Sequence, residues 1–394
     1  MSKRTPVVLL WHMHQPQYRD ALTGEYVLPW TYLHALKDYS DMAAHLEQVP
    51  GARAVVNFTP VLIEQLQDYA QRVAQHLLSG VPVRDRVLAT LTEAPLPVSV
   101  DARLDLVRAL LRAHRKTMIE PFPAYAEIVK VAESLATSER IAWASDQLIW
   151  DLSVWYHIAW LGETVRRGED RVRTLLEQGA GFAPAQRRKL LGLVAEVLAG
   201  ILPRYRKLAE SGCVELSVSP YAHPILPLLL DFRAAREALP ATRLPRHSVY
   251  PGGVDRANWQ MAEAIRVFRE TFGFVPRGCW PSEGAVSMAA LDTVERFNFG
   301  WLATSANVLR ASLAEQADDA GAFNVAYRVQ GHTVASFFRH DGLSDLIGFE
   351  YATWHGDDAA ANFVQEIERV ASQHPADDGR CILIALDGEN AWKL

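Results

Sequence analysis

The sequence lacks the features that mark disulfide-stapled and membrane-spanning proteins. It has only 3 cysteines in 394 residues, and this odd number is not typical of a disulfide framework. No apolar run approaches the roughly 20 residues that a membrane span needs. The apolar run at residues 7–11 is too short for a signal peptide. We therefore expect a cytoplasmic protein without a membrane partner.

The sequence also lacks an excess of positive charge. Its 40 Lys and Arg residues against 46 Asp and Glu residues give a net charge of −6. Nucleic acids attract proteins through clustered Lys and Arg side chains, so we expect no nucleic-acid partner. The hydrophobic content of 49% is ordinary for a globular protein and allows a large buried core. Composition carries no information on the oligomeric state.

Short apolar runs recur along the chain and predict β-strands. The seven runs are residues 7–11, 54–58, 213–219, 275–280, 299–305, 334–338 and 381–386. Most are continuous rather than alternating, as in parallel strands that are buried on both faces. Helical patterns lie between several of them, at residues 31–48, 255–272, 286–297 and 357–374, with Asp255 as a predicted N-cap. Alternation of strand and helix predicts an α/β fold, a TIM-like (β/α)7 barrel.

The stretch between the second and third runs is too long for one connection. Residues 60–212 are rich in Leu, Ala, Arg and Glu, with apolar residues at helical spacing such as Leu190, Val194 and Leu198. We expect residues 1–394 to form one catalytic barrel with a helical insertion at about 60–212. Only residues 387–394 follow the seventh run, so we also expect the chain to lack a C-terminal helical region.

Polar residues gather where the predicted strands end. Barrel enzymes place their active sites at this end, and burying unpaired charge is costly, so the clusters predict one shared pocket. Two strands contribute smaller polar residues, namely Asn57 and Thr59, then Ser217 and Ser219. The larger candidates are His12, His14, Glu215, His223, Trp280, Glu283, Arg339, His340, Asp387 and Trp392.

This set of residue types suits the cleavage of sugars. Two carboxylates about 5 Å apart can break a glycosidic bond with retention, one attacking the anomeric carbon and the other protonating the leaving oxygen. Trp280 and Trp392 offer indole faces that stack on sugar rings. The histidines would bind hydroxyl groups, and Arg339 would keep the nucleophile ionised.

Other interpretations of the same residues stay open. His12 and His14 lie on one face of a strand and, with Asp387 or Glu215, would suit a metal-dependent hydrolase or deacetylase. Glu283 alone could be a carboxylate favoured at the start of the following helix. That view explains neither the adjacent Trp280 nor Asp387. A chain without a C-terminal helical region could also be a glucan-binding protein that has no activity.

Four segments resemble the signatures of glycoside hydrolase family 57, in the family's order. They read LLWHMHQP at residues 9–16, GCVEL at 212–216, GCWPSE at 278–283 and LDGENAW at 386–392. Residues 338–349 resemble a further segment of the amylase-like branch of the family. The resemblance spans residues 9–392 and implies a (β/α)7 barrel, a retaining mechanism and no need for a metal ion or other cofactor.

The resemblance also assigns roles to single residues. Glu283 matches the nucleophile of the family and Asp387 its acid/base. The remaining matches are expected to bind substrate, and they are His12, His14, Glu215, His223, Trp280, Arg339, His340, Asp345 and Trp392. Family members include α-amylases, 4-α-glucanotransferases, branching enzymes, amylopullulanases and α-galactosidases. The expected substrate is an α-glucan or malto-oligosaccharide with α-1,4 bonds, cleaved by hydrolysis or by glycosyl transfer.

Overall fold

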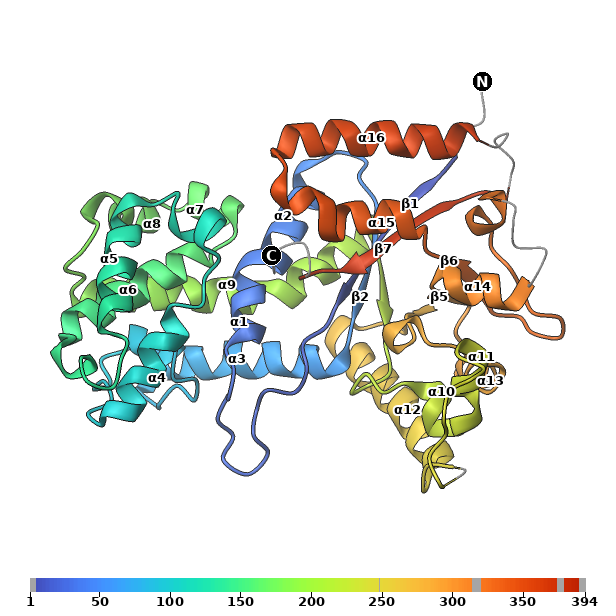
Figure 1. Ribbon diagram of the computed structural model, residues 1–394, viewed down its shortest axis with the longest axis horizontal. Coiled ribbons are helices and arrows are strands. Elements are labelled where there is room, and N and C mark those ends of the chain that lie inside the picture. Colours follow the sequence, from blue (N-terminus) through green and yellow to red (C-terminus); the bar gives the residue numbers. More distant parts are fainter. Residues whose placement is uncertain (1–4, 248, 314–319, 374–378, 390–394) are drawn as a thin grey trace. The chain divides into compact units, whose positions relative to one another are not determined.

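A parallel β-sheet of seven strands organises the fold in the computed structural model, which describes residues 5–247, 249–313, 320–373 and 379–389. Neighbouring strands pair in parallel in the order β6-β5-β4-β3-β2-β1-β7 (Figure 1). The strands are β1 (Val7–Met13), β2 (Ala54–Phe58), β3 (Val214–Val218), β4 (Gly278–Cys279), β5 (Trp301–Thr304), β6 (Ala335–Phe338) and β7 (Ile382–Asp387). Each of them overlaps one of the seven predicted runs.

The two edge strands of this sheet meet. Arg339, directly after β6, forms a parallel bridge with Leu383 of β7, and the backbone N–H of His340 donates to Leu383 O at 2.7 Å. The sheet therefore curls into a nearly closed barrel. This confirms the predicted TIM-like (β/α)7 barrel.

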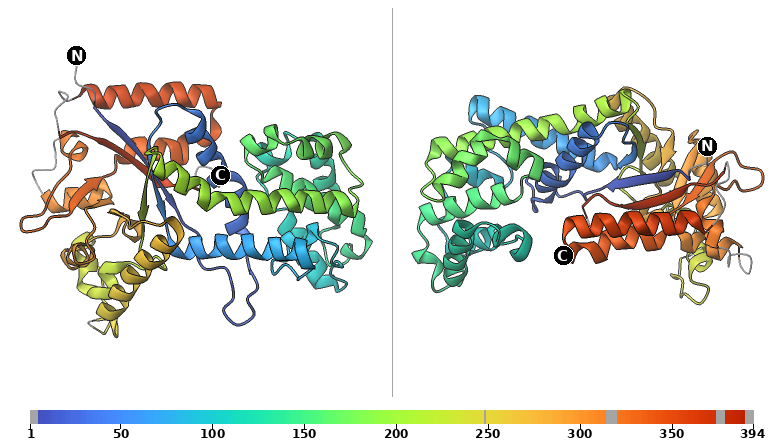
Figure 2. Two further views of the ribbon diagram at one scale, coloured as in Figure 1. Left: turned by 180° about the vertical axis from the view of Figure 1, so that it is seen from behind. Right: turned by 90° about the horizontal axis from the view of Figure 1, so that it is seen from above.

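Apolar side chains fill both faces of the strands. Inside the barrel, Leu10, Trp280, Ala303, Leu383 and Ala385 form one buried cluster. Outside it, Ile382, Ile384 and Leu386 of β7 pack against α15 (Asp341–Asp345), the π-helix Leu346–Glu350 and α16 (Gly356–Ser372). Figure 2 shows α16 running along β1 and β7. Burial on both faces is why the predicted strands are continuous apolar runs.

The chain divides into two compact units. Unit 1 comprises Met1–Pro16, Pro50–Ile63 and Tyr205–Leu394, and unit 2 comprises Gln17–Val49 and Glu64–Arg204. Unit 1 contains the barrel together with α10 (Leu226–Leu230), α11 (Ala235–Ala238), α12 (Gly253–Phe272), α13 (Met288–Arg296), α14 (Ala306–Leu313), α15 and α16. Unit 2 therefore includes residues 17–49, whereas the sequence pattern places only residues from about 60 to 212 in the insertion.

Unit 2 is built from helices. Parts of α3 (Pro60–Ser79) and α9 (Pro184–Glu210) belong to it, with α1 (Trp30–His34), α2 (Ser40–Gln48), α4 (Val100–Leu110), α5 (Pro123–Leu135), α6 (Asp146–Ala159), α7 (Glu163–Gly168) and α8 (Asp170–Gln178). A π-helix at Ala35–Tyr39 joins α1 to α2, so the predicted helix at residues 31–48 has one widened turn. In the part of the chain that the structure describes, no helix is long and apolar enough to cross a membrane.

The start of α12 differs from the prediction. Its N-cap is Gly252, which has a φ of 65°, and Asp255 lies in the first turn instead of capping the helix. Glycine adopts this left-handed conformation without a steric penalty. The helix therefore begins before the aspartate that the pattern selected.

Candidate active site

Three histidines meet at the carboxyl end of the barrel. His12 belongs to β1, His14 follows that strand, and His223 lies in the loop after β3. The His223 ring centroid is 4.8 Å from that of His12 and 4.2 Å from that of His14. The structure therefore brings together three residues that the sequence selected from two separate segments.

β2 and the residue that follows it hold two of these rings in place. His12 Nδ1 lies 2.7 Å from Asn57 Oδ1, and His14 Nδ1 lies 3.0 Å from Thr59 Oγ1. His14 also donates its backbone N–H to Glu389 Oε1 at 3.1 Å. The sequence places Asn57, Thr59 and Glu389 at strand ends but assigns no role to them. Asn57 and Thr59 have the two-residue spacing that puts side chains on one face of a strand.

Burial favours the neutral form of two of these imidazoles, His12 and His223. Desolvation by burial lowers the pKa of His12 to about 4. Desolvation, together with the proximity of His12 and His14, lowers the pKa of His223 to about 2. A neutral imidazole has one N–H donor and one acceptor nitrogen. The pocket thus offers uncharged hydrogen-bonding groups near neutral pH.

Glu283 stands on a strained turn at the end of β4. It lies in the short 3₁₀ segment Ser282–Gly284 with a φ of 55°, which is unfavourable for a residue other than glycine. Its Oε1 is 3.4 Å from His223 Nε2, and 73% of its side chain is exposed. His223 has a φ of 58°. Two adjoining residues of the pocket thus have strained backbones, which is common at functional sites.

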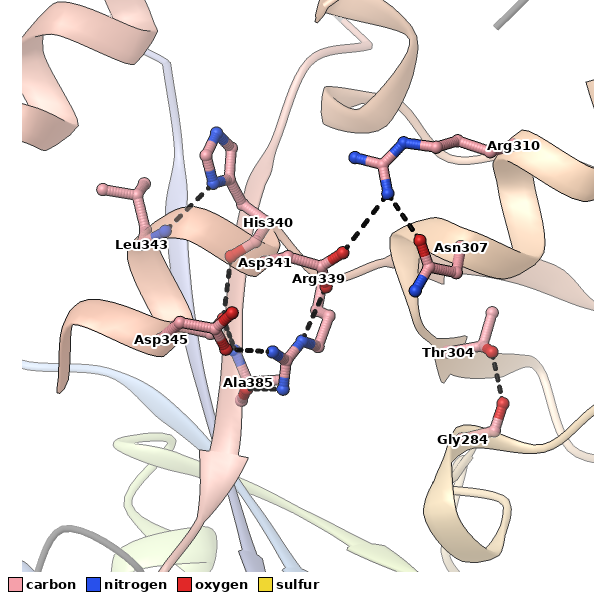
Figure 3. A network of polar contacts seen from close by, with 11 residues as sticks. Gly284, Thr304, Asn307, Arg310, Arg339, His340, Asp341, Leu343, Asp345 and Ala385 are labelled. Atoms are coloured by element: carbon pink, nitrogen blue, oxygen red, sulfur yellow. Dashed lines mark hydrogen bonds and ion pairs between the residues drawn. The ribbon is translucent and has the colours of Figure 1, made fainter. Parts of the chain in front are cut away.

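The Glu283 turn is tied to the next strand. Thr304, the last residue of β5, donates its hydroxyl to the Gly284 carbonyl oxygen (Figure 3). Trp280, just before the turn, is buried, and its ring centroid is 5.9 Å from that of His12. The carboxylate is therefore exposed, while the segment that carries it is anchored.

Asp387 lies beside His12. It is the last residue of β7 and is paired with His12 in the strand register. The Gly388 N–H donates to His12 O at 2.7 Å. Glu283 and Asp387 thus come from separate strands but stand at the same end of the barrel, one next to His223 and the other next to His12.

The β6 residues form a separate polar network (Figure 3). The Arg339 guanidinium donates to Asp341 at 2.9 Å and to Asp345 at 2.5 Å. His340 Nδ1 accepts the Leu343 N–H as the N-cap of α15. Arg339 was expected to keep the nucleophile ionised, but its guanidinium pairs with these two aspartates. The network joins the end of β6 to α15.

Glu215 lies apart from the other predicted residues. It is near the start of β3, two residues before Ser217, which shares the level of Asn57 and His12 in the register. Its Oε1 accepts the Trp301 indole N–H at 2.7 Å, and it faces a hollow of about 640 Å³ at the amino end of the strands. The sequence signature locates this glutamate inside the barrel but not at which end. Trp392 lies outside the described residues.

The arrangement suits a neutral, hydroxyl-rich ligand. Two carboxylates flank neutral imidazoles, and carboxylates can act as nucleophile, acid or base. Among residues 5–247, 249–313, 320–373 and 379–389, no group of three or more His, Cys, Asp or Glu side chains is placed to hold a metal ion. The His12 and His14 pair is instead bonded to Asn57 and Thr59.

Comparisons with known proteins give one family. The sequence model of glycosyl hydrolase family 57 matches residues 8–394. A search of curated proteins found no matching sequence.

Solved structures with the same fold are longer than this chain. A branching enzyme of that family from Thermococcus kodakaraensis is 15% identical, with a TM-score of 0.56. A second branching enzyme, from Pyrococcus horikoshii, is 14% identical, with a TM-score of 0.52. The α-amylase AmyC from Thermotoga maritima is 13% identical, with a TM-score of 0.53. The alignments cover 99% of this chain but 66%, 66% and 68% of those proteins, respectively.

Proposed function

The chain belongs to glycosyl hydrolase family 57, and we propose that it cleaves α-1,4 bonds of α-glucans as a retaining glycoside hydrolase or transglycosylase. One observation carries the proposal. Glu283 lies 3.4 Å from His223, Asp387 is paired with His12, and the two imidazoles are 4.8 Å apart. The two carboxylates therefore stand beside the same group of imidazoles, as a pair that acts on one sugar ring must.

Glu283 is the proposed nucleophile and Asp387 the proposed acid/base. Glu283 attacks the anomeric carbon while Asp387 protonates the leaving oxygen, which gives a covalent glycosyl-enzyme. Asp387 then takes a proton from water or from a sugar hydroxyl, which displaces Glu283. The exposure of Glu283 and the burial of the segment around it support the first role, since a nucleophile must be both reachable and fixed.

The surrounding residues are proposed to bind the sugar. His12, His14 and His223 form hydrogen bonds with hydroxyl groups, and the buried Trp280 ring lies beside His12. Arg339, His340 and Asp345 shape the side formed by β6, and Trp392 is a stacking platform by its sequence position alone. Glu215 is left out of this set because it faces the amino end of the strands.

Hydrolysis and transfer differ only in the acceptor of the second step. Incubation with maltoheptaose followed by product sizing separates them, because hydrolysis gives only shorter sugars and transfer also gives longer ones. Branching enzymes and an α-amylase share the fold, so both outcomes fit the proposal. Unchanged maltoheptaose, amylose and glycogen would contradict it.

Matched variants connect the activity to the carboxylates. Glu283→Gln and Asp387→Asn should each reduce turnover at least about a thousandfold, because each removes a group needed in both steps. Glu215→Gln is the control, since it changes the same functional group inside the same barrel at its other end. Equal losses in Glu215→Gln and Glu283→Gln would argue that folding, not chemistry, is affected.

A cytoplasmic location is also proposed. Cys213, Cys279 and Cys381 are free thiols, and free thiols persist in a reducing compartment. Fractionation of cells that produce the protein tests this location.

A further inference from the structure

A chain of buried polar groups lies next to His12. Three completely buried residues form it, namely Asn57 of β2, Ser217 of β3 and Ser219 directly after β3. The Asn57 amide atom beside His12 is 2.7 Å from His12 Nδ1 and 2.9 Å from Ser219 Oγ. Its other amide atom is 3.1 Å from Ser217 Oγ. Each of these hydrogen bonds must contain one proton, so counting the protons shows which atom of each pair is the donor.

The count starts at a carbonyl group. Ser219 Oγ lies 2.7 Å from the Trp280 carbonyl oxygen, which can only accept. The single hydroxyl proton of Ser219 is therefore used in this bond. The Asn57 atom 2.9 Å from the same Ser219 oxygen then has to be a donor, because two oxygens without a proton between them repel.

An asparagine amide fills the same volume when its oxygen and nitrogen exchange places. With its nitrogen towards His12, Asn57 donates one proton to Ser219 Oγ and the other to His12 Nδ1. Its oxygen then accepts the Ser217 hydroxyl proton. This orientation gives each contact one proton, and the opposite orientation leaves the Asn57 and Ser219 oxygens facing each other.

We propose that Asn57, aligned by Ser217 and Ser219, is a positioning residue that holds His12 in the Nε2–H form. His12 then presents a donor, not an acceptor, to the ligand. Its Nε2 is buried and has no hydrogen-bond partner among the described residues. A buried N–H without an acceptor is unfavourable, so an oxygen of the bound sugar is the partner that fits. Only this last step rests on the proposed function.

The form of His12 is measured directly by ¹⁵N NMR. The full chain is labelled at the histidine ring nitrogens, and the His12→Gln spectrum identifies the His12 signals. At about pH 7 we expect a bare Nδ1 and a protonated Nε2. A protonated Nδ1 with a bare Nε2 would overturn the proposal, and this result needs no activity.

The role of Asn57 is tested by Asn57→Asp, which has the same shape but no N–H to donate. His12 Nδ1 should gain a proton in this variant, and kcat/KM on maltoheptaose should fall at least about tenfold. Asn362→Asp is the control, because the Asn362 amide oxygen accepts the Tyr351 hydroxyl proton and an aspartate keeps that bond. A bare Nδ1 in Asn57→Asp would overturn the role of Asn57.

The two proposals fail separately. A protein with His12 in the Nε2–H form and no turnover of any α-glucan supports the positioning of His12 and contradicts the proposed function. An active protein with a protonated His12 Nδ1 supports the proposed function and contradicts the positioning of His12. If Asn57→Asp does not fold, the wild-type spectrum still decides the form of His12.

Discussion

At the scale of single residues, the pocket contains backbone strain in its centre. Glu283 and His223 both have left-handed φ angles, and their side chains approach to 3.4 Å. Such a conformation costs about 1 kcal/mol or more for a residue with a Cβ atom. Surrounding contacts hold such a conformation, and the hydrogen bond from the Thr304 hydroxyl to the Gly284 carbonyl oxygen is one such contact at the Glu283 turn.

This strain predicts a reversed order of stability for two substitutions. Glu283→Gly should be more stable than Glu283→Ala by about 1 kcal/mol, because only glycine adopts a φ of 55° without strain. Ala289→Gly in the exposed face of α13 is the control and should lose about 1 kcal/mol instead. Urea unfolding of the variants measures both differences. A Glu283→Ala variant as stable as Glu283→Gly would mean that the turn is relaxed.

His157 of unit 2 predicts acid sensitivity. Burial lowers its pKa to about 4, while its nitrogens bond to Ser153 O at 2.7 Å and to the Tyr32 hydroxyl at 3.0 Å. In the unfolded chain its pKa returns to about 6.5, so acid protonates the unfolded state first. Stability is complete above about pH 6.5 and falls by about 1.4 kcal/mol per pH unit down to about pH 4.

The variant His157→Gln separates this effect from the titration of other groups. It should be less stable than the wild type at pH 7, and the difference should shrink at pH 5. Urea unfolding at both pH values gives the comparison. A difference that stays constant between pH 7 and pH 5 would show that His157 does not titrate in this range.

The sequence predicted the candidate catalytic and binding residues better than the residues that hold them in position. His12, Trp280 and Glu283 stand in recognisable segments at strand ends, so their gathering follows from the topology. Asn57 stood among the polar residues at the strand ends, but its role could not be assigned, because that role depends on the register that places it level with His12. Glu215 was selected from its segment, but it lies two residues before the level of His12 in the register. That difference is enough to place its side chain at the amino end of the barrel.

At the scale of elements, the strand that leads to Glu283 is very short. β4 has two residues, Gly278 and Cys279, and the Trp301 ring of β5 lies over Gly278. A Cβ atom on Gly278 would lie 2.0 Å from the Trp301 ring. The glycine is therefore required by close packing, and the indole N–H is fixed by its hydrogen bond to the Glu215 carboxylate.

This packing predicts that Gly278→Ala is destabilising. The ring must move to admit the methyl group, which should cost about 1–3 kcal/mol and also reduce turnover by shifting the Glu283 turn. Gly348→Ala is the matched control, because a Cβ atom at Gly348 meets nothing within 4 Å. Thermal unfolding and maltoheptaose assays compare the two. Equal stability of both variants would refute the role of the indole.

The positions of strands and helices could be predicted from the sequence where a single physical effect determined the pattern of residues. The strands were predictable because β-strands buried on both faces are apolar runs. In β7, the outer face of the barrel carries Ile382, Ile384 and Leu386, and the inner face carries Leu383 and Ala385. The start of α12 at Gly252 was not, because a glycine in a left-handed conformation competes with the stronger capping signal of Asp255. The π-helix at Ala35–Tyr39 left no sign in the apolar spacing.

At the scale of the whole molecule, seven strands predicted a barrel, but its closure depends on contacts between strands far apart in sequence. The bridge of Arg339 to Leu383 makes that closure, and no local pattern marks it. The division into units is equally non-local, because residues 17–49 join unit 2 although they lie between β1 and β2.

The net charge of −6 leads to a prediction for a neutral substrate. Electrostatic steering acts on charged ligands and weakens with salt. The kcat/KM for maltoheptaose should therefore change less than about twofold between 0.05 and 0.5 M NaCl. Initial rates at several sodium chloride concentrations measure it. A loss of tenfold or more would indicate a charged ligand and a different function.

The central claim is that Glu283 forms a covalent bond with the sugar. A 5-fluoro-α-glucosyl fluoride slows the second step more than the first, so the glycosyl-enzyme accumulates and survives digestion. Mass spectrometry of the peptides should show one 5-fluoroglucosyl adduct, on Glu283 and absent in Glu283→Gln. Turnover of α-glucans with no adduct, or with the adduct on another residue, would contradict the account.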